Sequence, residues 1–318
     1  MTAAKQINQI IENIERTVVG KRKEIELCLT ALLADGHVLL EDVPGVGKTL
    51  LVKSMAQSIG AEFKRIQFTP DLLPSDVTGV SIYNQQSQSF TFRPGPIMAN
   101  IVLADEINRT SPKTQSALLE SLEEASITID GETRHLSKPF FVMATQNPVE
   151  YAGTFPLPEA QLDRFLIKLQ IGYPSINEEL EMLSRIEEGM MDDGIAPVLT
   201  TEQILALQEE VNRVRVDVQV KSYIVRLTHA TRAHRSVDLG VSPRGTIALM
   251  KAAQAYALIQ GRSFVIPDDV KHLAMNVLSH RILLTTDAKL ANITISHILK
   301  DILKRTEVPV VKSRALSS

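Results

Sequence analysis

The chain has 318 residues, of which 44% are hydrophobic and 22% charged, so it is long enough for two domains with buried cores. The formal net charge of −3 argues against a protein that attracts nucleic acid through an overall positive field. No apolar run approaches the length of a membrane-spanning helix, and the first residues lack the apolar core of a signal peptide. We therefore expect a cytoplasmic protein without a membrane span.

The N-terminal segment, residues 1–20, is typical of an amphipathic helix because its isoleucines recur at helical spacing. The single cysteine, Cys28, follows on a second helical face that also carries Ile25 and Leu29. A lone cysteine among apolar residues predicts a buried structural thiol rather than a nucleophile.

The segment HVLLEDVPGVGKTLLVKSMA, residues 37–56, contains most of a phosphate-binding loop. The Walker A pattern is G-x-x-x-x-G-K-[ST]. Gly47, Lys48 and Thr49 complete it, but Asp42 stands where the first glycine belongs. A strand-like run precedes the loop and a helical period follows it, which favours a phosphate site over a chance match. Because the first glycine serves the turn, and aspartate is a tolerated turn residue, we expect Asp42 to be a harmless variant.

In such a loop the backbone N–H groups hold phosphate oxygens, Lys48 reaches the β- and γ-phosphates, and the Thr49 hydroxyl binds Mg²⁺. ATP and Mg²⁺ are therefore the expected cofactors. The expected nucleotide contacts are Val19, Gly20, Asp42, Val43, Pro44, Gly45, Val46, Gly47, Lys48, Thr49 and Leu50.

Polar residues follow two further strand-like segments. In NIVLADEINRT, Asp105 and Glu106 come directly after an apolar run, where Asp105 would hold Mg²⁺ and Glu106 would orient the attacking water. In KPFFVMATQNP, Asn147 ends a third strand and could contact the γ-phosphate. Taken singly, an acidic pair in a solvated turn or an asparagine before proline would explain each segment.

The segments EDVPGVGKT, FRPGP, LADEINR, LEEASITIDGE, ATQNP and LPEAQLDRFL together resemble the MoxR family of AAA+ ATPases. This resemblance covers nearly the whole chain. It implies an α/β fold, with an AAA+ P-loop core whose parallel five-stranded sheet is flanked by helices, and a C-terminal all-helical lid. It also implies a homo-oligomeric ring, commonly a hexamer, and chaperone-like work on a client or adaptor protein, often one with a von Willebrand factor A domain.

Arg164, in LPEAQLDRFL, matches the arginine-finger position of related AAA+ proteins. The resemblance implies that Arg164 reaches the γ-phosphate of a neighbouring subunit and adds positive charge to the transition state. The alternative is a local ion pair with Asp163 or Glu159.

Arg244 is placed by the local sequence VSPRGT in the first turn of a helix, with Ser242 as the N-cap. A cation there opposes the helix dipole, which is easier to explain if an anion lies opposite. The resemblance agrees, since Arg244 matches sensor 2, a lid arginine that senses phosphate. The alternative is a solvated surface arginine.

Strand patterns end near IGYPSINEE, and the segments that follow have a helical period. We therefore expect a nucleotide-binding core over residues 1–175 and a lid over residues 176–318.

Three functions fit the sequence. The first is a ring ATPase that remodels a client protein, and the second is a nucleic-acid-dependent motor. The third is a nucleotide switch that binds without hydrolysis. The predicted hairpin ITIDGETRHL offers only Arg134 and His135 to a nucleic acid, which weighs against a motor. Glu106 weighs against a switch, because a pure switch does not need a water-orienting carboxylate.

Overall fold

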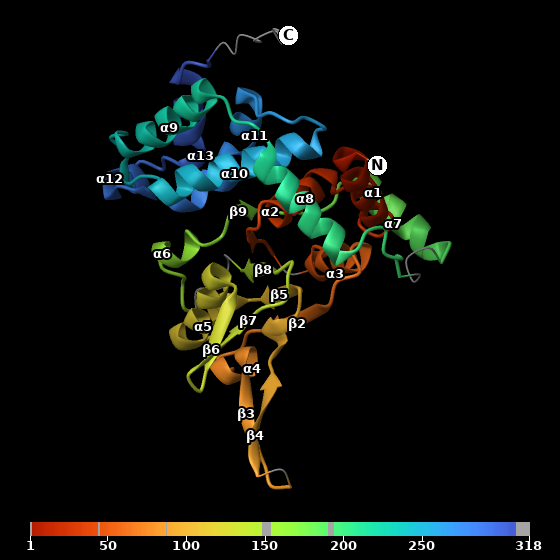
Figure 1. Ribbon diagram of the computed structural model, residues 1–318. Coiled ribbons are helices and arrows are strands. Elements are labelled where there is room, and N and C mark those ends of the chain that lie inside the picture. Colours follow the sequence, from red (N-terminus) through yellow and green to blue (C-terminus); the bar gives the residue numbers. More distant parts are fainter. Residues whose placement is uncertain (1, 44, 87, 148–153, 190–193, 310–318) are drawn as a thin grey trace, which may run out of the picture.

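The computed structural model describes residues 2–43, 45–86, 88–147, 154–189 and 194–309, so Pro44 of the expected nucleotide contacts lies outside it. Figure 1 shows an α/β core in the lower half and a helical layer above it. No helix in these described ranges is long and apolar enough to cross a membrane.

The core is built on a five-stranded sheet in the order β2-β5-β8-β1-β9, with every pairing parallel. Its strands are β1 (Val38–Glu41), β2 (Phe63–Gln67), β5 (Ile101–Asp105), β8 (Phe141–Gln146) and β9 (Ile167–Leu169). The central strands β1, β5 and β8 are almost wholly buried, which explains why they read as continuous apolar runs rather than alternating ones. Because all five strands are parallel, their carboxyl ends meet at one edge, where ligands bind in such sheets.

Helices and two hairpins surround this sheet (Figure 1). The helices of the first half are α1 (Ala3–Glu15), α2 (Arg22–Leu33), α3 (Lys48–Ser58), α4 (Pro74–Thr78), α5 (Pro112–Glu124) and α6 (Glu159–Leu162), with 3₁₀ turns η1 (Pro96–Met98) and η2 (Ile107–Arg109). The hairpins are β3 (Gly79–Asn84) with β4 (Ser89–Pro94), and β6 (Ser126–Ile129) with β7 (Glu132–His135). Asp130 and Gly131 make the β6–β7 turn with φ of 54° and 79°, as the Asp-Gly pair predicts.

The second half is helical, as expected, but it also contains a short two-stranded sheet. Its elements are α7 (Ile176–Glu187), α8 (Thr201–Arg213), α9 (Val218–Arg232), β10 (Val237–Leu239), α10 (Pro243–Ile259), α11 (Pro267–Leu278), η3 (Ser279–Arg281), β11 (Leu283–Leu284), α12 (Thr286–Leu290) and α13 (Ile295–Arg305). Strands as short as β10 and β11 carry no readable period, so the expectation of an all-helical lid was incomplete.

One hydrophobic core joins helices from both ends of the chain. Helix α10 packs against α1 and α2 as well as against α8, α9 and α11. Cys28 of α2 is completely buried in this core, as the sequence predicted, and burial raises the pKa of its thiol. Because this core spans the expected boundary, the division at residue 175 stays a prediction.

A buried histidine just before β1 connects this part of the chain to β8 and α5. The N–H of Val142 donates to Nδ1 of His37 at 3.1 Å, so Nε2 carries the proton and donates to the carbonyl of Leu122 at 3.1 Å. Burial lowers the pKa of His37 to about 4. The ring is therefore neutral near pH 7, and protonation would remove the acceptor that Val142 uses.

Candidate nucleotide-binding site

The phosphate-binding loop lies between β1 and α3, at the carboxyl edge of the sheet. Gly45 and Gly47 both have φ of +87°, the left-handed conformation that favours glycine. Lys48 begins α3, and its Nζ donates to the backbone carbonyl of Asp42 at 2.8 Å. The loop thus closes on itself through the lysine that the sequence assigned to phosphate.

Three of the predicted site residues, Asp42, Asp105 and Glu106, lie close enough to Lys48 for their charges to affect its pKa. Burial lowers the pKa of Lys48, while the charges of Asp42, Asp105 and Glu106 act in the opposite direction. The acidic pair after β5 therefore faces the lysine of the loop after β1, as the sequence analysis expected for strand ends at one edge.

Asp105 ends β5 and has a partner on each carboxylate oxygen. The Thr145 hydroxyl donates to Oδ1 at 2.6 Å, and Arg65 of β2 donates to Oδ2 at 2.6 Å. Mg²⁺ in nucleotide sites is held by one or two protein oxygens together with phosphate and water, so it does not need a larger cage. Among the described residues no group of three His, Cys, Asp or Glu side chains could hold a metal ion by itself. The donor set of Thr49 and Asp105 therefore fits nucleotide-linked Mg²⁺.

Glu106 adopts a left-handed backbone conformation, with φ 58° and ψ 49°, which is uncommon outside glycine and asparagine. Its N–H donates to the Thr145 hydroxyl at 2.8 Å. Its carboxylate accepts from Gln67 Nε2 at 2.9 Å and lies 3.3 Å from Nε of Arg109. Backbone strain of this kind collects at functional sites, where the surrounding contacts hold it in place.

Arg65 and Gln67 contact the acidic pair, and sequence reasoning missed both. Both lie on β2, whose register places Arg65 opposite Leu103 and Gln67 opposite Asp105. Their only sequence signal is the polar pattern FKRIQ, which becomes informative once β2 is known to pair with β5.

Three other residues were predicted to contact the nucleotide: Asn147, Val19 and Gly20. Asn147 follows β8 and is buried, and Val19 is buried in the segment between α1 and α2. Gly20 packs so closely on Glu178 that a Cβ would overlap that side chain, and its φ is +72°. Their roles toward ATP stay predictions.

Asp42 does more than the turn role that the sequence assigned to it. Its side chain is buried, with 7% of the residue exposed. Carboxylate oxygen Oδ2 accepts from two successive backbone amides, those of Ile171 and Gly172, the second at 3.0 Å. A glycine at this position could not make either bond.

The two arginines expected to sense phosphate share one carboxylate. Nε of Arg164 lies 3.2 Å from Glu123 Oε2, and Nη2 of Arg244 lies 2.8 Å from Glu123 Oε1. Glu123 is on α5, Arg164 follows α6, and Arg244 is in the first turn of α10, whose N-cap is Ser242 as predicted. The local alternative for Arg164 named the wrong carboxylates, because the partner is neither Asp163 nor Glu159.

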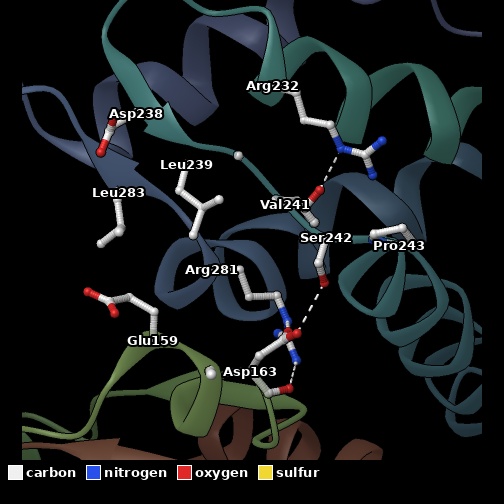
Figure 2. A pocket seen from close by; sticks show the side chains of 12 residues that line it. Glu159, Asp163, Arg232, Asp238, Leu239, Val241, Ser242, Pro243, Arg281 and Leu283 are labelled. Atoms are coloured by element: carbon white, nitrogen blue, oxygen red, sulfur yellow. Dashed lines mark hydrogen bonds and ion pairs between the residues drawn. The ribbon is translucent and has the colours of Figure 1, made fainter.

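Asp163 joins the core to the lid instead (Figure 2). Its Oδ1 accepts from Nε of buried Arg281 at 2.6 Å, and its Oδ2 accepts from the Ser242 hydroxyl at 3.1 Å. These contacts border a cavity of about 560 Å³, which α6 lines from below and the segment around Gly240 from above. The residue next to Arg164 is therefore tied to the helix that carries Arg244.

Comparison with known proteins agrees with this geometry. The description "ATPase family associated with various cellular activities (AAA)" matches residues 37–167, and "AAA lid domain" matches residues 229–302. The chain is also 42% identical to the chaperone MoxR1 of Mycobacterium tuberculosis, over 96% of this chain and 83% of that protein. The chain belongs to the MoxR family of AAA+ ATPases.

Other relatives cover comparable lengths. The YeaC protein of Bacillus subtilis is 62% identical over 96% of both chains. The MoxR protein of Paracoccus denitrificans is 31% identical over 84% of this chain and 86% of that one. A crystal structure from Cytophaga hutchinsonii, described as a candidate ATPase, superposes with a TM-score of 0.90 at 38% identity, covering 97% of this chain and 96% of that one. The AAA+ fold with a helical lid is thereby confirmed for this MoxR-family chain.

Proposed function

We propose that this MoxR-family chain binds ATP with Mg²⁺ at the carboxyl edge of its sheet and hydrolyses it to ADP and phosphate. The observation that carries the proposal is the meeting of Lys48 with Asp105 and Glu106 at that edge. Lys48 would exchange its bond to the Asp42 carbonyl for phosphate oxygens. Mg²⁺, held by Thr49 and Asp105, would supply further positive charge to the phosphates.

Glu106 is the group best placed to orient the attacking water. Its carboxylate is held by Gln67 and Arg109, and its backbone is fixed by Thr145. Asn147, after the neighbouring strand β8, would contact the γ-phosphate. This constellation favours hydrolysis over simple nucleotide binding, since a binding module has no need of a fixed carboxylate beside the Mg²⁺ site.

The second part of the proposal concerns assembly and client. Arg164 rests on α5, and we propose that it serves the γ-phosphate of an adjacent subunit in a homo-oligomeric ring, with six subunits as the expected number. Arg244 would read the phosphate from the lid. The name of the relative chaperone MoxR1 supports a role in acting on a client or adaptor protein. We place this work in the cytoplasm, and proteins with a von Willebrand factor A domain are the first candidates for the client.

The Glu106→Gln variant tests the hydrolytic part. It keeps the shape of the side chain and removes its charge, so ATP should bind while turnover falls by on the order of 10²-fold or more. Equilibrium binding of ATP and steady-state release of phosphate measure the two effects separately. Glu62→Gln, a matched change just before the amino end of β2, should leave both unchanged.

Turnover of the Glu106→Gln protein at the wild-type rate would assign hydrolysis to another group. The same assay with added single- and double-stranded DNA addresses the alternative function. Strong stimulation by DNA would favour a nucleic-acid motor over a protein remodeller.

A further inference from the structure

Asp42 connects three parts of the molecule through different atoms. Its N–H donates to the carbonyl of Gln146 at the end of β8, 3.2 Å away. Its carbonyl accepts from Nζ of Lys48 at 2.8 Å. Its carboxylate accepts from the amides of Ile171 and Gly172. Asp42 of the phosphate-binding loop thus contacts the end of β8 at the carboxyl edge of the sheet, Lys48, and a backbone segment that is distant in sequence.

That distant segment, residues 170–175, is the connection between β9 and α7. Ile171 is buried, and Gly172 has φ of +66°, so successive N–H groups turn toward one anion, as in backbone anion-binding nests. The connection has a second anchor, because Lys21 Nζ donates to the carbonyl of Tyr173 at 3.3 Å. Figure 1 shows α7 beside α1. Movement of this connection would therefore move the start of the helical half.

We infer that Asp42 is a positioning residue that couples the occupancy of the phosphate-binding loop to the connection between core and lid. The inference rests on the proposed function, because it requires phosphate to engage Lys48. The side chain that replaces the usual loop glycine is the element that transmits the change.

The coupling follows from the geometry around Lys48. When the ammonium group of Lys48 turns to phosphate oxygens, the Asp42 carbonyl loses its donor, and the Asp42 peptide unit has to find a new partner or shift. The carboxylate on the same residue is buried and holds two amides, so a shift of the backbone is passed to Ile171 and Gly172. Packed and hydrogen-bonded groups transmit such displacements because they have few alternative arrangements.

The usual Walker A pattern separates binding from coupling. Asp42→Gly restores the glycine of that pattern, so the phosphate loop should still form and bind nucleotide. The amides of Ile171 and Gly172 then lose their shared acceptor. Asp42→Asn keeps an acceptor oxygen but removes the charge, and charge-assisted hydrogen bonds are roughly twice as strong as neutral ones. The two variants should therefore weaken the contact in steps.

Hydrogen–deuterium exchange with and without an excess of Mg²⁺ and the ATP analogue AMP-PNP tests the inference. In the wild type, the analogue should protect the loop, residues 42–50, and alter exchange over residues 170–187. In Asp42→Gly, at an analogue concentration that saturates the variant, the analogue should protect the loop, but exchange over residues 170–187 should be fast and unresponsive. Asp42→Asn should fall between the two.

Glu41→Gln is the matched control. Glu41 is the preceding residue, and its carboxylate contacts Lys168 of β9 at 2.7 Å rather than the connection. Its removal should leave the response of residues 170–187 intact, which separates the role of Asp42 from a general loss of charge near the loop.

Each remaining outcome decides the question. A normal response of residues 170–187 in Asp42→Gly would overturn the inference, as would loss of nucleotide binding in that variant, which would place Asp42 in the loop alone. Exchange over residues 170–187 that the analogue does not alter in the wild type would also overturn it. If Asp42→Gly failed to fold, Asp42→Asn would serve as the test in its place. Exchange over residues 170–187 that is intermediate in Asp42→Asn would support the inference, and exchange identical to that of the wild type would overturn it. Failure of the wild type to bind the analogue would instead overturn the proposed function.

Discussion

Two carboxylates of this molecule each hold a pair of nitrogen donors, and they do so in contrasting surroundings. Asp42 is 7% exposed and binds two backbone amides, whereas the Glu123 side chain is 44% exposed and binds two guanidinium groups. Backbone amides are fixed by the fold, but arginine side chains rotate at small cost. The contact of Asp42 is therefore part of the architecture, and that of Glu123 is one that its arginines can leave.

Energetic scales support the same distinction. Half-exposed ion pairs contribute up to about 1 kcal/mol, because water screens them and the long side chains lose freedom. Removing the acceptor of buried donors costs about 1–3 kcal/mol for each donor left without a partner. A bound phosphate could draw Arg164 and Arg244 away from Glu123, but it could not easily draw the amides of the connection away from Asp42.

The largest expected effect tests whether Arg164 leaves Glu123 to act on a neighbour. Arg164→Ala keeps a complete site of its own but offers no finger, and Glu106→Gln has an inactive site with an intact Arg164. The pure Arg164→Ala oligomer should lose on the order of 10³-fold in turnover, and the pure Glu106→Gln oligomer on the order of 10²-fold or more. In mixed rings, some Arg164→Ala sites should receive a finger from a Glu106→Gln neighbour and hydrolyse ATP.

The measurement is ATP turnover per ring as one variant is titrated into the other. Activity should rise and then fall with the mixing ratio. Native mass spectrometry confirms that mixed rings form. If ATP turnover stayed at the baseline in such confirmed mixtures, Arg164 would act within its own subunit and would not leave Glu123 for a neighbour.

A second prediction uses His37, which resembles Asp42 in being buried between backbone partners. Its pKa is lowered from 6.5 to about 4 in the folded chain, so acid protonates the unfolded chain first. Its share of stability is complete above pH 6.5 and is lost as the pH falls toward 4. The loss should amount to about 3 kcal/mol of the free energy of unfolding.

Urea unfolding of the wild type and of His37→Gln between pH 7 and pH 4 measures this share. The glutamine amide can accept from Val142 and donate to Leu122 without titrating in this range, so the variant should lose less stability on acidification. His229→Gln, a change of an exposed histidine, serves as the control. Parallel pH curves for the wild type and His37→Gln would contradict the assignment.

The smallest expected effect comes from Glu123 itself. Glu123→Gln removes the shared charge, so Arg164 and Arg244 no longer have to leave an ion pair to reach phosphate. Apparent ATP affinity or turnover should rise by up to about fivefold at low salt, and the difference should shrink as salt is added. Glu120→Gln, one turn earlier on α5, is the control.

A fall in turnover with Glu123→Gln would contradict this view. It would mean that the carboxylate guides the arginines toward phosphate, and the contrast with Asp42 would then be one of degree only.

The sequence predicted those features that depend on neighbouring residues. Ser242 caps α10, Asp130 and Gly131 turn the β6–β7 hairpin, and the loop around Lys48 joins a strand to a helix. Each signal lies within a few residues, so a single sequence contains it. The five-stranded sheet and the lid came from the family resemblance, and the fold comparison confirms them.

The features it missed depend on residues far apart along the chain. Asp42 and Ile171 are separated by 129 positions, and nothing near Asp42 identifies a backbone amide as its partner. The joining of Arg164 and Arg244 through Glu123 likewise needs the packing of α5, α6 and α10. The polar end of β2 gains meaning only from its pairing with β5.

Cys28 has a practical consequence that follows from its burial. It is the only cysteine of the chain, none of its surface is exposed, and burial raises the pKa of its thiol, so thiol reagents should not modify the native protein. Modification would require α2 to separate from the shared core beneath the lid. The rate at which a thiol reagent labels Cys28 should therefore report how often the core opens, and no probe has to be introduced into the sequence.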